Sequence, residues 1–423
     1  MSAMKREKKE SAEQGHRLPR SPGAFWLPLS LILASMIICF LSLEAVVRMA
    51  VPGFRGFTQD DKRLFTKFDS YLGWRNVPGS KGVISGPGYF CSVHQNLQGL
   101  RDVEHERMHR PGIARVVVLG DSMVWGLGVE DDEIMARRAG ARLPGVEFIS
   151  MGTSGYGTDQ EFMWLQQDGL LYSPDLVFVV MYYANDMLDN TSSRRYSRNK
   201  PFFHLEPTGS LKLEGIPVKR DRSWLHRKLI NPIMDPLRNH SALFNLVTRR
   251  QHVLHERFRH RPWYRKIFGR PGDSDWLDLY LPSNKPWVKK AMDVTRGILA
   301  EFRETCEDLA AGPVVILLPH EVEVEPGEWE RMIENYGLDG LNLDRDEAGK
   351  KLKKAFSMKG IRVIDPVSEM RKAARTQRLY YPGDGHLTRF GQDVLGRIIA
   401  QETRKLLEAR KTGDEMIPHD KTL

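Results

Sequence analysis

Cysteine is scarce in this sequence. The 423 residues include three cysteines, Cys39, Cys91 and Cys306. No cysteines and histidines have the spacing of a zinc site, so the sequence predicts neither a structural metal nor a cofactor. Whether Cys91 and Cys306 pair depends on the fold, because spacing alone does not decide it. No internal repeat with a period of roughly 20–50 residues is visible, which argues against solenoids and propellers.

Long apolar runs are also rare, and one stands out. It extends from Ala24 to Leu43, and as a helix rising about 1.5 Å per residue it spans roughly 30 Å, the thickness of one bilayer core. Six basic residues precede it: Lys5, Arg6, Lys8, Lys9, Arg17 and Arg20. They favour a cytoplasmic N-terminus. A cleaved signal peptide is the alternative, but its apolar region is shorter and the residues after Leu43 form a poor cleavage site. We therefore predict a cytoplasmic tail at 1–23 and a single membrane anchor at 24–48 in contact with lipid.

Five short runs rich in β-branched residues predict buried strands. They are 114–119, 146–151, 176–182, 314–318 and 361–364. Longer stretches with helical spacing lie between or after them, at 131–142, 288–309 and 389–410. This alternation predicts an α/β fold with an open parallel sheet covered by helices on both faces. In such folds, ligands bind beyond the carboxyl ends of the strands.

The composition changes around this predicted core. Residues 49–112 are rich in Gly and Pro, and we expect an irregular lead-in segment that packs on the main domain. The main domain is predicted at 113–410, with a basic cap insertion at 190–290 and a C-terminal tail at 411–423.

The insertion contains a predicted β-hairpin at 201–218 and then a strongly basic stretch at 219–270. That stretch carries 14 Lys or Arg against three acidic residues, a local excess of +11 compared with +9 for the whole chain. Aromatic residues interleave with the basic ones, as in many nucleic-acid binders. The predicted extracytoplasmic location argues against a nucleic-acid partner. We expect a solvated helical cap over the cleft, with anionic lipid headgroups or an acidic polysaccharide as alternative contacts.

A candidate nucleophile, Ser122, follows the first predicted strand in the run Gly120-Asp121-Ser122. A serine at a strand-to-helix turn exposes its hydroxyl above the sheet. Its backbone N–H lies at a helix N-terminus, where negative charge is favoured, as the oxyanion of a tetrahedral intermediate requires. The competing interpretation is that Asp121 or Ser122 merely caps the next helix.

A nucleophilic serine needs a base and an acid that orients the base. His386 and Asp384 occur in a glycine-containing loop after the last predicted strand, although this loop can also be read as a surface turn. Gly155 and Asn185 follow the second and third strands, where a backbone N–H and a side-chain amide can stabilise an oxyanion. His320 follows the fourth strand and either lines the cleft or is a rim or core histidine.

These motifs, in this order, resemble the SGNH, or GDSL-type, family of esterases and acyltransferases. The resemblance covers about residues 70–405, and the segment 96–102 is similar to a leader found in larger members. It implies a flavodoxin-like α/β/α sandwich with a central parallel sheet of about five strands. It also implies these roles: nucleophile Ser122, base His386, orienting acid Asp384, and oxyanion donors from Ser122 N–H, Gly155 N–H and the Asn185 side chain.

Two positions depart from the family pattern. The acid usually lies three residues before the histidine, where this chain has Gly383, whereas Asp384 lies two before. That shorter spacing resembles some polysaccharide-acetylating branches. Tyr183 replaces the glycine that usually opens the segment containing Asn185, which affects the expected shape of the pocket.

The sequence therefore predicts a membrane-anchored serine esterase or acyltransferase with an extracytoplasmic, periplasm-facing catalytic domain. Its substrates are expected to be acyl esters, in particular acetyl esters, of a cell-envelope carbohydrate. The alternatives are a non-catalytic carbohydrate-binding or assembly protein on a degenerate hydrolase fold, and a lipid-directed esterase whose basic stretch 219–270 forms a lid. The sequence does not determine the oligomeric state.

Overall fold

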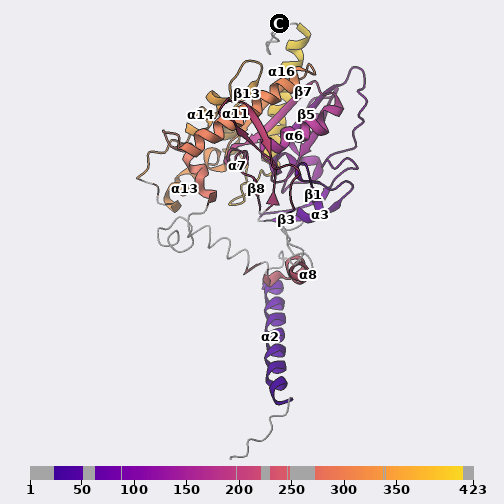
Figure 1. The fold of residues 1–423 in the computed structure, drawn as a ribbon, viewed down its shortest axis with the longest axis vertical. Helices are drawn as coiled ribbons and strands as arrows, with labels where there is room; N and C mark the ends of the chain where they lie inside the picture. The colour runs from indigo at the N-terminus through magenta and orange to yellow at the C-terminus, as the bar shows by residue number, and fades with distance from the viewer. Residues whose placement is uncertain are drawn as a thin grey trace, which may run out of the picture.

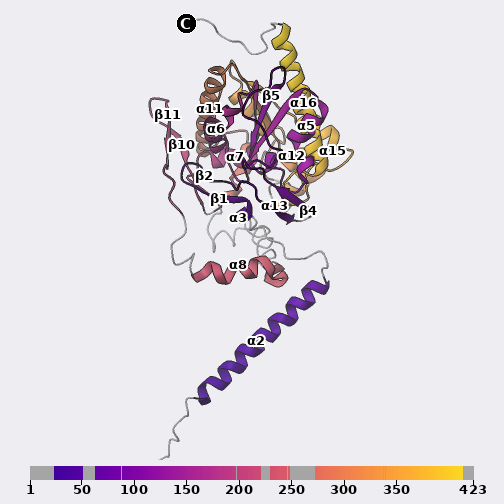
Figure 2. The same ribbon diagram turned by 90° about the vertical axis from the view of Figure 1, so that its right-hand side faces the viewer.

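The computed structural model describes residues 23–50, 62–220, 229–247 and 272–412, apart from single positions at 87, 197, 245, 337 and 339. A helix, α2 (Gly23–Ala50), projects from a rounded body, and α8 (Asn231–His240) lies between the two (Figures 1 and 2). The predicted anchor at 24–48 falls within α2. Its segment Ser30–Ala50 is, within the described chain, the one helix long and apolar enough to be a membrane anchor or signal sequence.

The five predicted strands form one parallel sheet. They are β5 (Ala114–Gly120), β6 (Val146–Gly152), β7 (Leu176–Tyr182), β12 (Gly312–Leu318) and β13 (Arg362–Ile364). Their order across the sheet is β6-β5-β7-β12-β13, with parallel pairing throughout. This order is that of a flavodoxin-like fold, in which ligands bind where the chain changes direction across the sheet. The predicted α/β/α sandwich is confirmed, and its switch point lies between β5 and β7.

Helices cover both faces of the sheet because successive side chains of a strand point to opposite faces. Val117, Val179 and Val315 pack on one side and Val116, Phe178 and Ile316 on the other. The first face is covered by α6 (Thr158–Gln167), α11 (Pro286–Glu307) and α14 (Glu347–Phe356). The second face is covered by α5 (Met135–Arg142), α15 (Val367–Ala374) and α16 (Arg389–Thr412) (Figure 2).

Shorter elements connect these layers. The short helices are α3 (Lys62–Phe65), α4 (Ser122–Trp125), α7 (Tyr183–Asp189), α12 (Glu321–Val324) and α13 (Glu328–Tyr336). The 3-10 turns are η2 (Asp131–Glu133), η3 (Gly169–Tyr172) and η5 (Gly272–Tyr280). The predicted helix at 131–142 is thus a 3-10 turn followed by α5.

The lead-in segment is more regular than we expected. It forms two antiparallel hairpins, β1 (Thr66–Asp69) with β2 (Gly73–Asn76) and β3 (Lys81–Gly86) with β4 (Tyr89–His94). Of the glycines that suggested irregular chain, Gly73 begins β2, Gly86 ends β3 and Gly88 lies in the turn between β3 and β4. Trp74 Nε1 donates to the Ser154 carbonyl at 3.1 Å and Asn76 Nδ2 to the Gly152 carbonyl at 3.0 Å. These contacts hold the lead-in against the loop that follows β6.

The predicted hairpin at 201–218 is present. Two-residue strands β8 (Arg194–Arg195) and β9 (Arg198–Asn199) precede it, and it consists of β10 (Phe202–Leu205) and β11 (Leu211–Glu214). Leu211 packs against Gly297 of α11, so the hairpin covers that helix. Of the basic stretch 219–270, most lies outside the described residues, and its role as a cap stays a prediction. Cys39, Cys91 and Cys306 are unpaired, the last two being buried.

Candidate active site

Ser122 is the first residue of α4, a single helical turn that begins directly after β5. Asp121 caps this turn, because its Oδ1 accepts a hydrogen bond from the Met123 N–H at 2.8 Å. Both interpretations of the Gly-Asp-Ser run therefore apply, each to a different residue. Asp121 fixes the turn, and the Ser122 hydroxyl is left to face the loop that carries His386.

Ser122, His386 and Asp384 form a continuous chain of hydrogen bonds. The Ser122 Oγ lies 2.9 Å from His386 Nε2, and His386 Nδ1 lies 2.6 Å from Asp384 Oδ1. Both distances fall in the range of about 2.6–3.2 Å expected between a nucleophile, its base and the orienting group. With the proton on Nδ1 donated to Asp384, Nε2 can accept the proton of the serine. Asp384, which lies two residues before His386, therefore reaches the imidazole ring.

The loop conformation explains why this short spacing works. Tyr381 N–H donates to the His386 carbonyl at 2.8 Å, which closes the loop on itself. Gly385 adopts a φ of +78°, in the left-handed region that other residues avoid, and the turn brings the side chains on either side of it together. Tyr381 also ties the loop to the rest of the site, since its hydroxyl donates to the Gly128 carbonyl at 2.9 Å.

Asn185 and Gly155 lie at the ends of the strands beside β5. Asn185 is in α7, and its Nδ2 lies 3.3 Å from Asp121 Oδ2. Asp121 precedes α4, the turn that carries the candidate nucleophile Ser122 and is called the nucleophile turn below. Gly155 lies in the turn after β6, where Gly152 is in register with Gly120 of β5. Direct hydrogen bonds thus join Ser122, His386 and Asp384. Asn185 approaches them through Asp121, and Gly155 is placed by strand register.

Tyr183, which replaces the glycine usual at this position in the family, points into the core. Its hydroxyl donates to the buried carboxylate of Glu323, which also accepts from the Tyr280 hydroxyl. Burial raises the pKa of Glu323 to about 7, and the two tyrosine hydroxyls counteract part of that effect. The Tyr183 side chain is buried in the hydrophobic cluster on the α11 side of the sheet. It therefore does not line the substrate pocket whose shape we expected it to affect.

His320 belongs to an aromatic stack beside the loop that carries Asp384 and His386. Its ring lies parallel to Trp276 at 4.5 Å and to Tyr182 at 6.1 Å. The Val322 N–H donates to His320 Nδ1 at 3.2 Å, which leaves the proton on Nε2 of the neutral ring. Burial lowers the pKa of His320 to about 4, so the ring is neutral at physiological pH. A methyl group at position 385 would lie 3.8 Å from the Tyr182 hydroxyl, so the stack borders the loop of His386.

Sequence reasoning missed the role of Arg101, although it lies in the leader segment 96–102. The guanidinium group is buried and is surrounded by backbone carbonyl groups and one carboxylate. Its acceptors are Asp131 Oδ1 at 2.7 Å, Trp125 O at 3.2 Å, Gly126 O at 2.6 Å, Ser92 O at 2.9 Å and Val129 O at 2.6 Å. Two of these carbonyls, those of Trp125 and Gly126, lie at the end of the helical turn that begins with Ser122. Arg101 therefore holds the C-terminal side of the nucleophile turn.

A group of buried acids lies near the nucleophile turn. Burial raises the pKa values of Glu161 and Asp186 well above the usual range, and the nearby charges of Asp121 and Asp189 raise both further. Among the described residues, no three His, Cys, Asp or Glu side chains are arranged as metal ligands.

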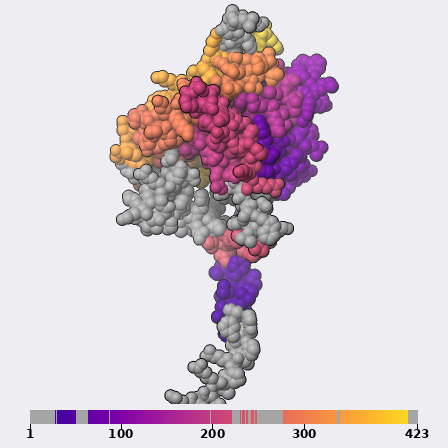
Figure 3. Space-filling model, viewed as in Figure 1, coloured from indigo at the N-terminus to yellow at the C-terminus, as the bar shows by residue number. Residues whose placement is uncertain are grey.

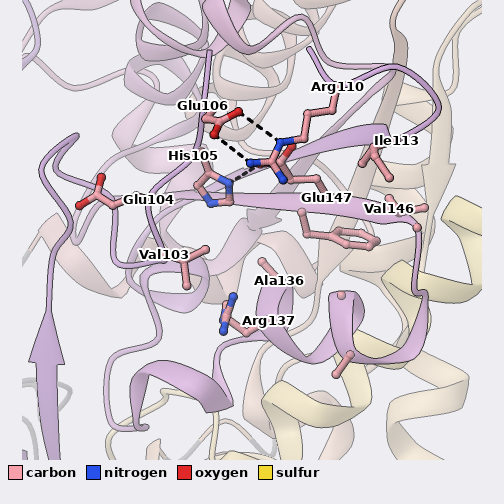
Figure 4. Close-up of a pocket in the computed structure, with 14 residues that line it drawn as sticks. Val103, Glu104, His105, Glu106, Arg110, Ile113, Ala136, Arg137, Val146 and Glu147 are labelled. Carbon is pink, nitrogen blue, oxygen red and sulfur yellow. Dashed lines mark hydrogen bonds and ion pairs between the residues drawn. The ribbon is translucent and has the colours of Figure 1, made fainter. Parts of the chain in front are cut away.

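A separate hollow of about 530 Å³ lies at the opposite end of the sheet, around the start of β6 (Figure 4). His105 lies there between two carboxylates, 3.1 Å from Asp102 Oδ2 and 2.8 Å from Glu147 Oε1. Burial by itself lowers the pKa of His105, but the hydrogen bonds and charges of Asp102 and Glu147 outweigh it and raise the pKa. This arrangement fastens the lead-in segment to β6. Ser122, Asp384 and His386 do not line the hollow.

A hydrogen-bonded Ser–His–Asp set at the carboxyl edge of a flavodoxin-like sheet is the arrangement of SGNH-type serine hydrolases, the family that the sequence motifs resemble. No family model and no curated protein matches the chain. Among solved structures it is similar to a member of the lipolytic protein G-D-S-L family from Veillonella parvula, at 12% identity and a TM-score of 0.32 over 70% of this chain and 98% of that one. It is also similar to a GDSL-like lipase from Bacteroides thetaiotaomicron, at 16% identity and a TM-score of 0.30 over 69% and 88%.

A third similar structure is a catalytic mutant of an acetylxylan esterase from Geobacillus stearothermophilus. The identity is 12% and the TM-score 0.32, over 70% of this chain and 96% of that one. At these identities the likeness concerns the fold.

Proposed function

We propose that this protein is a membrane-anchored serine esterase or acyltransferase that acts on acyl esters, in particular acetyl esters, of a cell-envelope carbohydrate. The observation that carries the proposal is the hydrogen-bond chain from the Ser122 hydroxyl through His386 to Asp384. A serine hydroxyl alone is a weak nucleophile, and a base oriented by an acid is what activates it.

The geometry supports a two-step acyl transfer. Ser122 Oγ attacks the ester carbonyl while His386 Nε2 takes the serine proton, and Asp384 stabilises the resulting imidazolium. The oxyanion would accept hydrogen bonds from the Ser122 and Gly155 N–H groups and from Asn185 Nδ2. The alcohol leaves with the proton from His386, and an acyl-serine ester remains. Water, or a sugar hydroxyl, then attacks this ester with His386 again as base, which restores Ser122.

Two features support the acetyl-carbohydrate assignment and the location. The Asp384-x-His386 spacing resembles that of polysaccharide-acetylating branches of the family. The apolar helix α2, with basic residues before it in the sequence, favours an anchor with a cytoplasmic N-terminus and a periplasmic catalytic domain.

The test is active-site labelling of the full chain in detergent with a fluorophosphonate probe. We expect labelling of the wild type, no labelling of Ser122→Ala, and unchanged labelling of Ser210→Ala, a control at an exposed serine of the β10–β11 hairpin. Well-folded wild type that does not react at Ser122 would contradict the proposal. Glycan binding that survives Ser122→Ala, without esterase activity in the wild type, would establish a non-catalytic binding protein instead.

Substrate class is tested by comparing turnover of acetylated oligosaccharides with that of long-chain esters in liposomes. We expect the acetylated sugars to be the better substrates. The reverse order would favour a lipid-directed esterase. Adding an unacetylated sugar acceptor then separates the two reactions, because a transferase gives an acetylated acceptor and a hydrolase gives free acetate.

A further inference from the structure

The end of α2 holds the segment that follows α8. Glu44 of α2 accepts hydrogen bonds at 2.8 Å from Ser241 Oγ, Ala242 N–H and Leu243 N–H. Arg48, one turn further on α2, donates to the same carboxylate at 2.7 Å. Ala242 is fully buried at this contact. In the space-filling view the atoms of α8 lie directly above those of α2 (Figure 3).

The level of this joint follows from the sequence of α2. The uncharged run ends at Leu43, and as a helix that run spans about 30 Å, one bilayer core. Glu44 is therefore the first charged residue of α2, and it lies in the last two turns of the apolar segment Ser30–Ala50. Because α8 is tied to Glu44, it lies at the level of the lipid headgroups when α2 spans a bilayer. Figure 2 shows α8 lying crosswise between α2 and the body.

The apolar side chains of the α8 segment bury little within the protein. Ile233 is 68% exposed and Leu229 is 56% exposed. Several others in the described part of 229–247 are exposed or half-buried: Ile230, Met234, Leu237, Leu243, Leu246 and Val247. Within the described residues these apolar side chains do not belong to the hydrophobic cores on either face of the sheet, so another partner is needed to remove them from water.

Some apolar side chains are also exposed at the end of the body that faces α8. Both ribbon views place α3 and β1 at this end, and Figure 1 also places β3 there (Figures 1 and 2). Leu64 of α3, Phe68 of β1 and Val83 of β3 are exposed there. Exposed apolar side chains thus occur on α8 and on the neighbouring end of the body, both on the side from which α2 emerges.

We infer that α8 is an interfacial helix that lies in the plane of the membrane, fastened to the anchor by Glu44, and that its partner is the lipid surface. The inference rests on the proposed role of α2 as a retained anchor and goes beyond the proposed catalysis. Helices of this kind insert their apolar face about 5–10 Å into the boundary between headgroups and acyl chains. The sequence supplies basic residues on both sides of α8, Arg227 and Lys228 before it and Arg249 and Arg250 after it, which suit anionic headgroups.

The lipid surface is a better partner than a second copy of the chain because of the joint with α2. Every copy that inserts α2 brings α8 to the headgroups, whatever the number of copies. Such a helix would hold the catalytic body at a fixed height and tilt above the bilayer, where a single unsupported anchor would leave it free to swing.

The test uses the full chain in lipid nanodiscs with a fluorophore that reports polarity, attached to one introduced cysteine. Cys39→Ser removes the exposed native thiol, and Cys91 and Cys306 are buried. The probe site is Ile233→Cys. The control inside the bilayer is Met36→Cys on α2. The control at the far pole is Leu309→Cys, which lies beside Ala310, whose carbonyl accepts from Arg410 near the end of α16. The nanodiscs contain lipids that carry a quencher either near the headgroup or deep in the acyl chain. The stronger of the two quenching effects shows how deep the fluorophore lies in the bilayer.

We expect a blue-shifted emission at position 233 and stronger quenching by the shallow quencher than by the deep one. Position 36 should respond to the deep quencher and position 309 to neither. Water-like, unquenched emission at 233 with normal quenching at 36 would overturn the inference and leave the anchor intact. Absence of quenching at position 36 would overturn both the proposed membrane anchor and the inference about α8. Protection of 233 only in discs that hold two copies would show that a second chain, not lipid, covers α8.

Discussion

Replacing Arg101 with alanine should reduce both the stability and the turnover of the protein. The buried guanidinium donates to four backbone carbonyls and to Asp131, and all five contacts lie within 3.2 Å. A buried acceptor that loses its donor costs about 1–3 kcal/mol. Because water can enter the space and the losses overlap, we expect a total of about 3–5 kcal/mol. That is a large part of the roughly 5–15 kcal/mol by which a native protein is stable.

The more informative variant is Arg101→Lys, which keeps the charge but cannot reach five acceptors with one ammonium group. Two of the lost acceptors, Trp125 O and Gly126 O, end the turn that carries Ser122. A small displacement of Ser122 relative to His386 should lower kcat by roughly tenfold or more, since misplacement by about 1 Å can cost 100-fold. KM for p-nitrophenyl acetate should change little. The measurements are steady-state kinetics and urea unfolding of the full chain in mild detergent.

Arg296→Ala provides the matched control. Arg296 is exposed and pairs with Asp293 at 3.2 Å, so its loss should change stability by no more than about 0.5 kcal/mol. If Arg101→Lys unfolds at the wild-type urea concentration and keeps the wild-type kcat, then Arg101 does not position the nucleophile turn.

Three further predictions follow from the loop and the aromatic stack. Asp384→Asn should lower kcat by roughly 10³- to 10⁴-fold with little change in KM, and a loss below about tenfold would show that another group orients His386. Gly385→Ala should cost about 1–2 kcal/mol, because position 385 has a left-handed backbone, and should lower kcat. Gly140→Ala, inside α5, should be neutral or stabilising, as urea midpoints would show. His320 has a folded-state pKa of about 4, below its value of about 6.5 in the unfolded chain. The unfolded chain therefore binds the extra proton, and stability falls as pH decreases from about 6.5 to about 4. His320→Phe should flatten that part of the profile of urea midpoint against pH.

The strands were the most predictable part of the fold. Those of a parallel sheet are buried on both faces, and the runs that become β5, β6 and β7 are almost continuously apolar. Their carboxyl ends then place Ser122 and Asn185 at one edge, because parallel strands all end there. The short hairpins β1–β2 and β3–β4 escaped prediction because strands of four to six residues between glycines carry little periodic signal.

Other parts of the candidate site depend on contacts between distant residues. Arg101 lies in a segment that resembles a family leader, but its acceptors at positions 92–131 are found only once the chain is folded. For His320 the sequence left a cleft position and a rim or core position open, and the structure places its ring in an aromatic stack. Its stacking partner Trp276 belongs to the insertion, where no periodic pattern predicted it. The reach of Asp384 depends on the backbone angles at Gly385, which the sequence permits but does not specify.

The small size of α4 explains why so many distant residues converge on it. A helix of four residues has no stability of its own, since a first turn fixes several backbone angles for a single hydrogen bond. Asp121 caps its beginning, Arg101 binds its last carbonyls, and Gln392 Nε2 of α16 donates to the Met123 carbonyl at 2.8 Å. These groups come from the residue between β5 and α4, from the lead-in segment and from the C-terminal helix. The position of the Ser122 hydroxyl is thus fixed from several sides before substrate binds, which is what a preorganised nucleophile requires.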